Sequence, residues 1–353
     1  MALSAGDLSA TTYFRIPPRE VAELVAQVEI RGVQRRGWSM RPSGVIARPM
    51  MRQASSPATA GQTDIRLGLL LGLAGVLVFS LTLPVTRRAV QELAPEVVGL
   101  GRTIPAALLA LVVVAAYRRL PRGRDLPAVM VCASGVVFGF PLLSALAMRT
   151  VDASHGAVVL AVLPLLTAAA GAVLAGERPS ARFWLWAVLG SASVLGFALL
   201  RSRGGLAAGD LYLLAASLLA AIGYAVGGRL AREAPGLLVI AWALVVSLPV
   251  LLVIGVALWP AVNTGASATA WACFAYVAVM SQFLGFYFWY RGLALGGIAR
   301  VGQVQLFQTF FTLAASALLL GERLDALTLG FALLTFLFVW LARRERIAAA
   351  APR

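Results

Sequence analysis

The fold is decided by two stretches of sequence, Ala153–Arg178 (ASHGAVVLAVLPLLTAAAGAVLAGER) and Ile298–Arg323 (IARVGQVQLFQTFFTLAASALLLGER). Each is an apolar run that closes with Gly-Glu-Arg, and the second copy lies 145 residues after the first. A weaker match, at an offset of 140 residues, pairs Ala94-Pro95 with Ala234-Pro235. The sequence therefore contains an internal repeat of one structural unit, as do many membrane proteins.

The composition indicates that most of the chain lies in a lipid bilayer. Hydrophobic residues make up 60% of the 353 residues and charged residues 13%, whereas about 25% of an average soluble domain is charged. All 30 basic residues are arginine, against 15 acidic residues, so the net charge is +15. These arginines lie between apolar runs and in the tails, not in one continuous stripe, so nucleic-acid binding is not expected. An ordinary soluble domain is excluded.

Apolar stretches of roughly 17 to 24 residues follow one another from about residue 64 onward. About 20 apolar residues in a helix cross the ~30 Å of bilayer hydrocarbon. Lipid offers no partner for free backbone N–H and C=O groups, and the alternation of a barrel strand is absent, so each stretch is expected to be a helix. The expected spans are 67–85, 95–117, 127–147, 156–175, 183–200, 208–227, 236–259, 270–290, 301–320 and 326–342. The prediction is an all-α integral membrane protein with ten transmembrane helices.

The two copies are expected to have inverted topology. Each contains five spans, and because five is odd, the second copy enters the membrane from the opposite side. The first five-helix repeat is placed at 64–203, the second at 204–345, and a short cytoplasmic tail at 346–353. Residues 1–63 form a polar, arginine-rich tail, which is interpreted as disordered or as an upstream start-site error. Apolar residues at helical spacing over 21–28 leave a short amphipathic helix open as an alternative.

The placement of arginine predicts the orientation. With the N-terminus inside, 23 of the 30 arginines fall in cytoplasmic segments. Without the N-terminal tail, the balance is still 14 against seven. Basic residues next to spans stay on the cytoplasmic side, so both termini are expected in the cytoplasm.

On these features the chain resembles the EamA-type ten-helix proteins of the drug/metabolite transporter superfamily. The residues that carry the resemblance are Gly176-Glu177-Arg178, Gly321-Glu322-Arg323, Pro164 in the fourth span, Arg102 in the second span and the Arg118-Arg119 pair after it. The resemblance covers about residues 65–345. The joint arrangement over ten spans carries it, because Gly-Glu-Arg alone is short.

The resemblance implies a carrier in the bacterial inner membrane for small metabolites or drugs, often an exporter, without a bound cofactor. It also implies that the fourth and ninth helices line a central cavity. The chain departs from a symmetric pattern at one point, because Thr309 stands where the first copy has Pro164. A symmetric pair of proline bends is therefore not assured.

The ninth span carries a candidate substrate face. Gln305, Gln308 and Thr309 are spaced i, i+3 and i+4, which places them on one side of a helix. Amide groups both donate and accept hydrogen bonds, so this face suits an uncharged polar or a zwitterionic solute. Hydrogen bonding between helices, worth about 0.6 kcal/mol on average, is an equally weighted alternative.

The eighth span is unusually aromatic. Gln282, Phe286 and Tyr290 share one face at i, i+4 and i+8 and are substrate-binding candidates, because an aromatic cavity suits flat solutes. Trp289 is instead favoured as a membrane-interface anchor, an alternative also open for Tyr290. Tyr224 and Trp242, on the sixth and seventh spans, are weaker candidates. Core packing is the main alternative for both.

Four further residues are candidates for coupling or gating. They are His155, Arg102, Glu177 and Glu322. The lone histidine could titrate near neutral pH, or it could simply cap its helix. The arginine, seven residues into its span, either extends outward to the headgroups or faces a cavity and attracts an anionic group. For the two glutamates, charge pairing at a helix end is favoured over substrate binding.

The sequence does not favour an enzyme. It contains no Walker GxxxxGK[ST] motif and no HExxH motif, and Cys132 and Cys273 lie in apolar runs without metal-ligand spacing. No cofactor or metal is expected, and the partners are a small-molecule substrate and the lipid bilayer. The leading hypothesis is a secondary transporter that works by alternating access; the alternative is a non-transporting membrane scaffold or sensor. The sequence leaves the oligomeric state open.

Overall fold

The computed structural model describes residues 62–175, 178–201, 207–345 and 347–348. The N-terminal tail with its alternative amphipathic helix lies outside these residues, and so does Glu177. The described chain is helical almost throughout. A short antiparallel pair, β1 (Arg178–Pro179) with β2 (Ile347–Ala348), joins the loop before the fifth expected span to the segment after the tenth.

Many of the helices are built from two or three consecutive segments. In chain order the segments are α3 (Gln62–Ser80), α4 (Thr82–Ala89), η1 (Val97–Gly101), α5 (Thr103–Tyr117), η2 (Gly123–Asp125), α6 (Leu126–Ala133), η3 (Ser134–Gly139), α7 (Phe140–Thr150), α8 (Ala153–Val159), η4 (Leu160–Val162), α9 (Leu163–Ala175), α10 (Ala181–Arg201), α11 (Ala208–Leu230), α12 (Gly236–Leu258), η5 (Trp259–Ala261), α13 (Ala268–Tyr276), η6 (Val277–Leu284), α14 (Gly285–Gly296), α15 (Ile298–Gly302), η7 (Gln303–Gln305), α16 (Leu306–Leu320) and α17 (Ala326–Arg344). Segments η1, η3 and η6 are π-helical, and η2, η4, η5 and η7 are 3₁₀ turns.

Within the described ranges, eight helices are long and apolar enough to cross a membrane. They coincide with the first eight expected spans, from Thr63–Ala89 to Ala268–Gly296. Two shorter apolar helices, Phe307–Leu320 and Ala326–Ala342, lie on the last two. The helical segments α15, η7 and α16 nevertheless follow one another without a gap from residue 298 to 320. The predicted all-α fold class is confirmed apart from the short β1–β2 pair, while the count of ten crossings and the inverted topology stay predictions.

Irregular helical turns recur at matching places in the two copies. The 3₁₀ turns η4 and η7 interrupt the two segments that carry the sequence repeat, and the π-helical segments η3 and η6 interrupt the spans before them. Pro164 has no N–H to bond the carbonyl four residues earlier, which explains the turn that precedes it. Thr309 stands at the matching position, and a 3₁₀ turn, η7, still precedes it, two residues earlier than the position equivalent to η4. The interruption therefore does not depend on proline.

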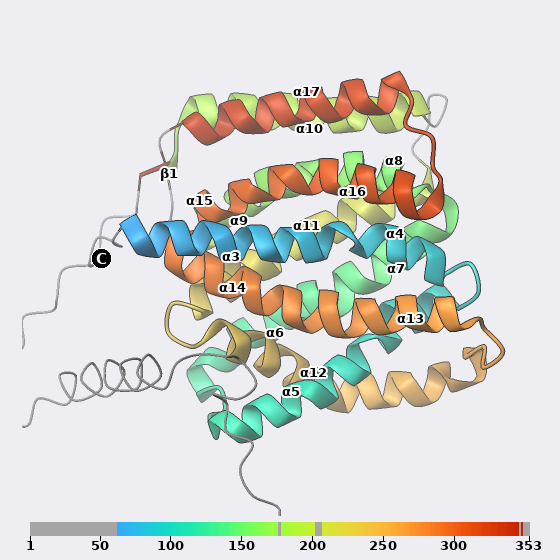
Figure 1. Ribbon diagram of the computed structural model, residues 1–353. Coiled ribbons are helices and arrows are strands. Elements are labelled where there is room, and N and C mark those ends of the chain that lie inside the picture. Colours follow the sequence, from blue (N-terminus) through green and yellow to red (C-terminus); the bar gives the residue numbers. More distant parts are fainter. Residues whose placement is uncertain (1–61, 176–177, 202–206, 346, 349–353) are drawn as a thin grey trace, which may run out of the picture. The chain divides into compact units, whose positions relative to one another are not determined.

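The helices pack in pairs that match between the copies (Figure 1). Helix α3 packs along α14, and α11 packs along α6, η3 and α7. Helix α11 also packs along α9, and three further pairs are α5 with α12, α10 with α17, and α8 with α16. If each of the first five expected spans is exchanged for its counterpart among the last five, the α3–α14 pair becomes the α11–α7 pair. The last three pairs named above are unchanged by this exchange.

Glycines bring α3 and α14 into backbone contact. A Cβ added at Gly68 would lie 2.6 Å from the backbone nitrogen of Gly296, and one added at Gly292 would lie 2.9 Å from the backbone oxygen of Gly68. Helices in lipid associate through small residues of this kind, which let the two backbones approach closely. In the matching pair, Gly135 of η3 faces the backbone of Leu219 in α11 in the same way.

Candidate functional site

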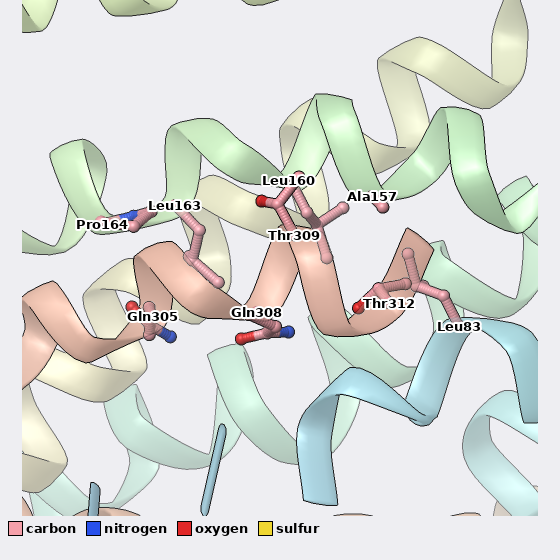
Figure 2. Close-up of a pocket in the computed structure, with 9 residues that line it drawn as sticks. All are labelled: Leu83, Ala157, Leu160, Leu163, Pro164, Gln305, Gln308, Thr309 and Thr312. Atoms are coloured by element: carbon pink, nitrogen blue, oxygen red, sulfur yellow. The ribbon is translucent and has the colours of Figure 1, made fainter. Parts of the chain in front are cut away.

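A first cavity lies between the two segments that carry the sequence repeat. It has about 270 Å³ of empty space, part of which is open to solvent, and it is called the repeat cavity here. Its lining residues are Leu83, Ala157, Leu160, Leu163, Pro164, Gln305, Gln308, Thr309 and Thr312. In Figure 2 the glutamines and threonines of η7 and α16 lie opposite the leucines and the proline of the α8–α9 segment. The structure thus brings together the three polar residues predicted on one face of the ninth span.

Gln305 has unused hydrogen-bonding capacity in this cavity. The residue is only 2% exposed, and neither its amide nitrogen nor its amide oxygen has a hydrogen-bond partner among the described residues. Burial of an amide without a partner is unfavourable by about 1–3 kcal/mol. Thr309 and Thr312 are buried beside it. The unpartnered amide is therefore available to a bound solute or to water.

A second cavity, with about 280 Å³ of empty space that is partly open to solvent, adjoins the first at Gln308, which lines both. It is called the arginine cavity here. Its lining residues are Phe79, Thr82, Arg102, Phe140, Tyr224, Ser281, Gln282, Phe286 and Gln308. Tyr224 of the sixth span and Gln282 and Phe286 of the eighth were predicted to bind substrate, and all three line this cavity. Arg102 of the second span, a predicted gating residue, lines it with them. The aromatic residues predicted on the sixth and eighth spans therefore line a cavity next to the one lined by the polar face of the ninth span.

Arg102 is the charged side chain of this cavity. It lies between η1 and α5 and is 1% exposed, so it does not extend to the headgroups. Its Nε and Nη1 atoms have no hydrogen-bond partner among the described residues. Of the two alternatives that the sequence left open, the structure therefore has the side chain facing the cavity.

The rest of the wall is aromatic, with a few paired polar groups. Phe79 and Phe286 meet edge to face at 5.1 Å between ring centroids, and Tyr224 lies 5.9 Å from Phe286. The hydroxyl groups of Thr82 and Ser281 lie 2.8 Å apart, which joins the first and eighth spans. Sequence reasoning missed Phe79, Thr82, Phe140 and Ser281. The spacing of Phe79 and Thr82, at i and i+3, was a usable signal.

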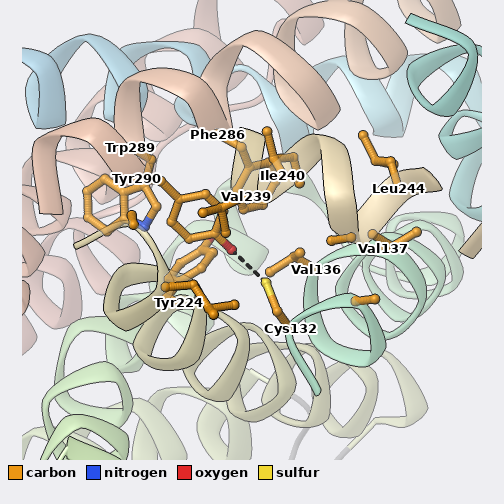
Figure 3. Close-up of a cluster of buried hydrophobic side chains, with 14 of the residues drawn as sticks. Cys132, Val136, Val137, Tyr224, Val239, Ile240, Leu244, Phe286, Trp289 and Tyr290 are labelled. Carbon is orange, nitrogen blue, oxygen red and sulfur yellow. Dashed lines mark hydrogen bonds between the residues drawn. The ribbon is translucent and has the colours of Figure 1, made fainter. Parts of the chain in front are cut away.

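Tyr290 belongs to the hydrophobic core (Figure 3). Its hydroxyl lies 3.2 Å from Cys132 Sγ and donates to the backbone oxygen of Gly223 at 3.3 Å. It is not among the described lining residues of either cavity. Trp289, next to it, is fully buried against α3 beside Gly75, so its interpretation as an interface anchor is wrong. The close approach of α14 to α3 covers the indole.

Trp242 also lies apart from the described lining of both cavities. Its indole Nε1 donates to the backbone oxygen of Arg119 at 2.8 Å, and the Arg119 guanidinium lies 6.0 Å from the ring centroid. At the same end of the helices, Arg124 lies 3.6 Å from Glu233. These contacts tie the loop after the second span to the start of the seventh.

His155 makes a buried contact at the opposite end of the helices. Its Nε2 lies 2.5 Å from Asp210 Oδ1, and the two side chains are 7% and 0% exposed. The second carboxylate oxygen of Asp210 accepts from the backbone N–H of Ala207 at 3.0 Å. The His155 ring also stacks obliquely on Phe197, with centroids 4.9 Å apart. Sequence reasoning missed Asp210, because 55 residues separate it from its partner.

Glu322 satisfies the N-terminus of the helix that carries His155. Its two carboxylate oxygens accept from the backbone N–H groups of Ala153 at 2.9 Å and of Ser154 at 2.8 Å. The first N–H groups of a helix have no partner within it, and the helix dipole favours a negative charge there. The Gly-Glu-Arg motif of the second copy therefore binds the repeat segment of the first.

Glu92 forms a third connection between the copies at this end. Its carboxylate accepts from the backbone N–H of Ser267 at 2.7 Å and from the Ser267 hydroxyl at 2.9 Å, and Arg88 donates to it at 2.7 Å. The Ser267 N–H, followed by the Arg88 guanidinium, lowers the pKa of Glu92 below its ordinary value of 4.5. This carboxylate caps the loop before α13.

The described residues contain no group of three or more metal-ligating side chains. Cys132 and Cys273 are free. The described lining of the two cavities offers one guanidinium, amides, hydroxyls and aromatic rings, which are groups that can bind a solute.

A family model described as the EamA-like transporter family matches the chain twice, over residues 66–199 and 207–344. The chain belongs to the EamA-like transporter family. In Bacillus subtilis (strain 168) a protein named "Uncharacterized transporter YdeK" is 41% identical to it over 278 residues, which are 78% of this chain and 97% of the relative. The expected membership in the drug/metabolite transporter superfamily is thereby confirmed.

A solved crystal structure resembles this EamA protein with a TM-score of 0.57 at 18% sequence identity. The match covers 78% of this chain and 97% of the solved one. At this identity the likeness concerns the fold alone. Together with the apolar helices, the family match identifies a multi-pass integral membrane protein of a transporter family.

Proposed function

We propose that this protein is a secondary transporter of small metabolites or drugs, which exports its solute from the bacterial cytoplasm by alternating access. The observation that carries the proposal is the pair of adjoining cavities, which meet at Gln308 among the helices of both copies. Among the described residues, the Gln305 amide and the Nε and Nη1 atoms of Arg102 have no hydrogen-bond partner, so a solute in these spaces could bond to them. We propose no catalytic activity for the protein.

The proposed mechanism exchanges two inverted five-helix halves, 64–203 and 204–345. The matched helix pairs and the matching interruptions η4 with η7 and η3 with η6 support this duplication. In inverted-repeat transporters, substrate sites lie near the midplane, and one half rocks against the other around the fixed site. Exchange of the two conformations then converts a cavity open on one side into one open on the other.

We assign gating to the end of the helices where His155 meets Asp210. Three connections cross between the halves there: the His155–Asp210 contact, the cap by Glu322 and the cap by Glu92. Opening of this end must break them together, because each joins one half to the other. The excess of arginine at the opposite end supports a periplasmic location for this gate and a cytoplasmic location for both termini.

The test is solute flux in proteoliposomes that contain the purified full chain. A panel of neutral, zwitterionic, anionic and cationic solutes is offered to right-side-out and to inverted vesicles. We expect at least one class to move faster than in protein-free liposomes, with faster flux in the direction that corresponds to export. Flux at the protein-free level for every class would instead support a scaffold or sensor.

A further inference from the structure

Among the residues that the structure describes, Arg102 is a buried cation without a counterion. Within the described ranges, no carboxylate forms an ion pair with it, and its Nε and Nη1 atoms are buried and unpartnered. A charge taken out of water is unfavourable unless it is paired and hydrogen-bonded. Among the described residues, the guanidinium thus has no counterion and two of its nitrogen atoms have no hydrogen-bond acceptor. Its side chain lines the arginine cavity.

The other described lining residues of this cavity carry no charge. Hydroxyl groups and amides supply polar contacts, and four aromatic side chains supply flat apolar walls. No acidic side chain is present in that lining to pair an ammonium group. A solute with an amino group would therefore bring a second positive charge next to the guanidinium, and like charges at short range repel strongly in a medium of low dielectric constant.

We propose that the arginine cavity binds the carboxylate of a small organic monoanion with a flat apolar body, and that Arg102 is its counterion. A guanidinium presents its N–H groups in a fork that matches the two oxygens of a carboxylate, and such charge-assisted bonds are the strong ones in proteins. One cation balances one negative charge, so a monoanion fits better than a dianion. The rings of Phe79, Phe140 and Phe286 would contact the apolar body.

This inference rests on the proposed function, and it names the substrate class. It differs from what the amides of the ninth span indicate alone, which is an uncharged or zwitterionic solute. The difference arises because the arginine comes from the second span and reaches the same pair of cavities from another helix.

The test is equilibrium binding of four probes with one phenyl ring each to the full chain in lipid nanodiscs at pH 7. The probes are 3-phenylpropionate, 3-phenylpropanol, phenylalanine and 2-phenylethylamine. We expect 3-phenylpropionate to bind at least about tenfold more tightly than each of the others. Arg102→Gln should weaken its binding about 10- to 100-fold, and Arg102→Lys should restore part of the loss. The control is Arg149→Gln, which removes an exposed arginine of α7 and should leave binding unchanged.

Three outcomes would overturn the inference: equal binding of the alcohol or of phenylalanine, binding of none of the probes, or unchanged 3-phenylpropionate binding by Arg102→Gln. Flux assays separate this failure from failure of the proposed function. If the protein carries a neutral or cationic solute and Arg102→Gln carries it equally fast, the transporter proposal holds and the monoanion inference falls. If no solute of any class moves, the transporter proposal falls as well.

Discussion

His155 Nε2 lies 2.5 Å from Asp210 Oδ1, so a buried pair joins the start of the fourth expected span to the start of the sixth. The two residues belong to different halves of the proposed duplication. Their contact, with the Glu322 cap next to it, holds one end of the helices together without any covalent link.

Loss of the His155–Asp210 contact should destabilise the end of the helices to which we assign gating. We expect His155→Gln and Asp210→Asn each to lower the free energy of unfolding by about 1–3 kcal/mol, because each weakens a buried hydrogen bond in which the Asp210 carboxylate takes part. In a double-mutant cycle the two effects should not add, because the residues are in contact. The control is Asp152→Asn, whose pair with Arg87 is 55% exposed on the carboxylate side and should contribute less than about 1 kcal/mol. Additive effects in the cycle would argue against the pair as a unit.

The polar face of the repeat cavity should control flux. Gln305→Ala and Gln308→Ala are each expected to lower the rate of solute flux about 3- to 10-fold, because each removes an amide that lines the cavity. Gln91→Ala is the matched control, since Gln91 lies in an exposed loop and should leave flux unchanged. The measurement is the initial rate in proteoliposomes at equal protein content. Wild-type rates in both cavity variants would show that the site assignment is wrong.

Replacement of Arg102 by an apolar residue should stabilise the protein in the absence of solute. A buried charge without a partner is unfavourable, and even a buried ion pair can often be replaced by hydrophobic residues of similar volume with a gain of up to about 1–4 kcal/mol. Arg102→Met should therefore raise Tm in lipid nanodiscs without added ligand. A lower Tm would indicate that the guanidinium is satisfied within the fold and is not reserved for a ligand.

The Glu92 cap should make stability depend on pH in the acidic range. Its pKa is lower in the folded chain than its ordinary value of 4.5, so its contribution is present above that value and is lost as pH falls through the folded pKa. Unfolding monitored from pH 7 down to pH 3 should show that Glu92→Gln is less stable than the unmodified protein near neutrality, with a difference that shrinks below pH 4.5. Ser267→Ala keeps the backbone donor and should retain most of this pH dependence. A difference that grows toward low pH would contradict the assignment.

The glycine contact between α3 and α14 should tolerate no side chain. Gly68→Val is expected to destabilise the fold by about 1–3 kcal/mol, because the added atoms would press on the backbone at Gly296. Gly330→Ala is the control, since a Cβ there meets nothing within 4 Å. Equal unfolding midpoints for the two variants would mean that the helices can separate at little cost.

The sequence predicted the helices well, because an apolar run of span length in lipid has to satisfy its backbone internally. It also predicted the polar face of the ninth span, because helical spacing alone places Gln305, Gln308 and Thr309 together. The partner of His155 could not be predicted, since the contact depends on how the fourth and sixth spans pack. Trp289 was misjudged for the same kind of reason: its burial follows from the glycines of α3, which lie more than 200 residues away in the chain.

The most direct test of alternating access is to label one cavity residue from each side of the membrane. Thr309→Cys is introduced into a chain whose native cysteines are replaced by Cys132→Ser and Cys273→Ala, and a membrane-impermeant thiol reagent is applied to right-side-out and to inverted vesicles. Alternating access predicts that Cys introduced at this position reacts from both sides, and that a transported solute slows the reaction. Reaction from one side only, or from neither, would contradict it.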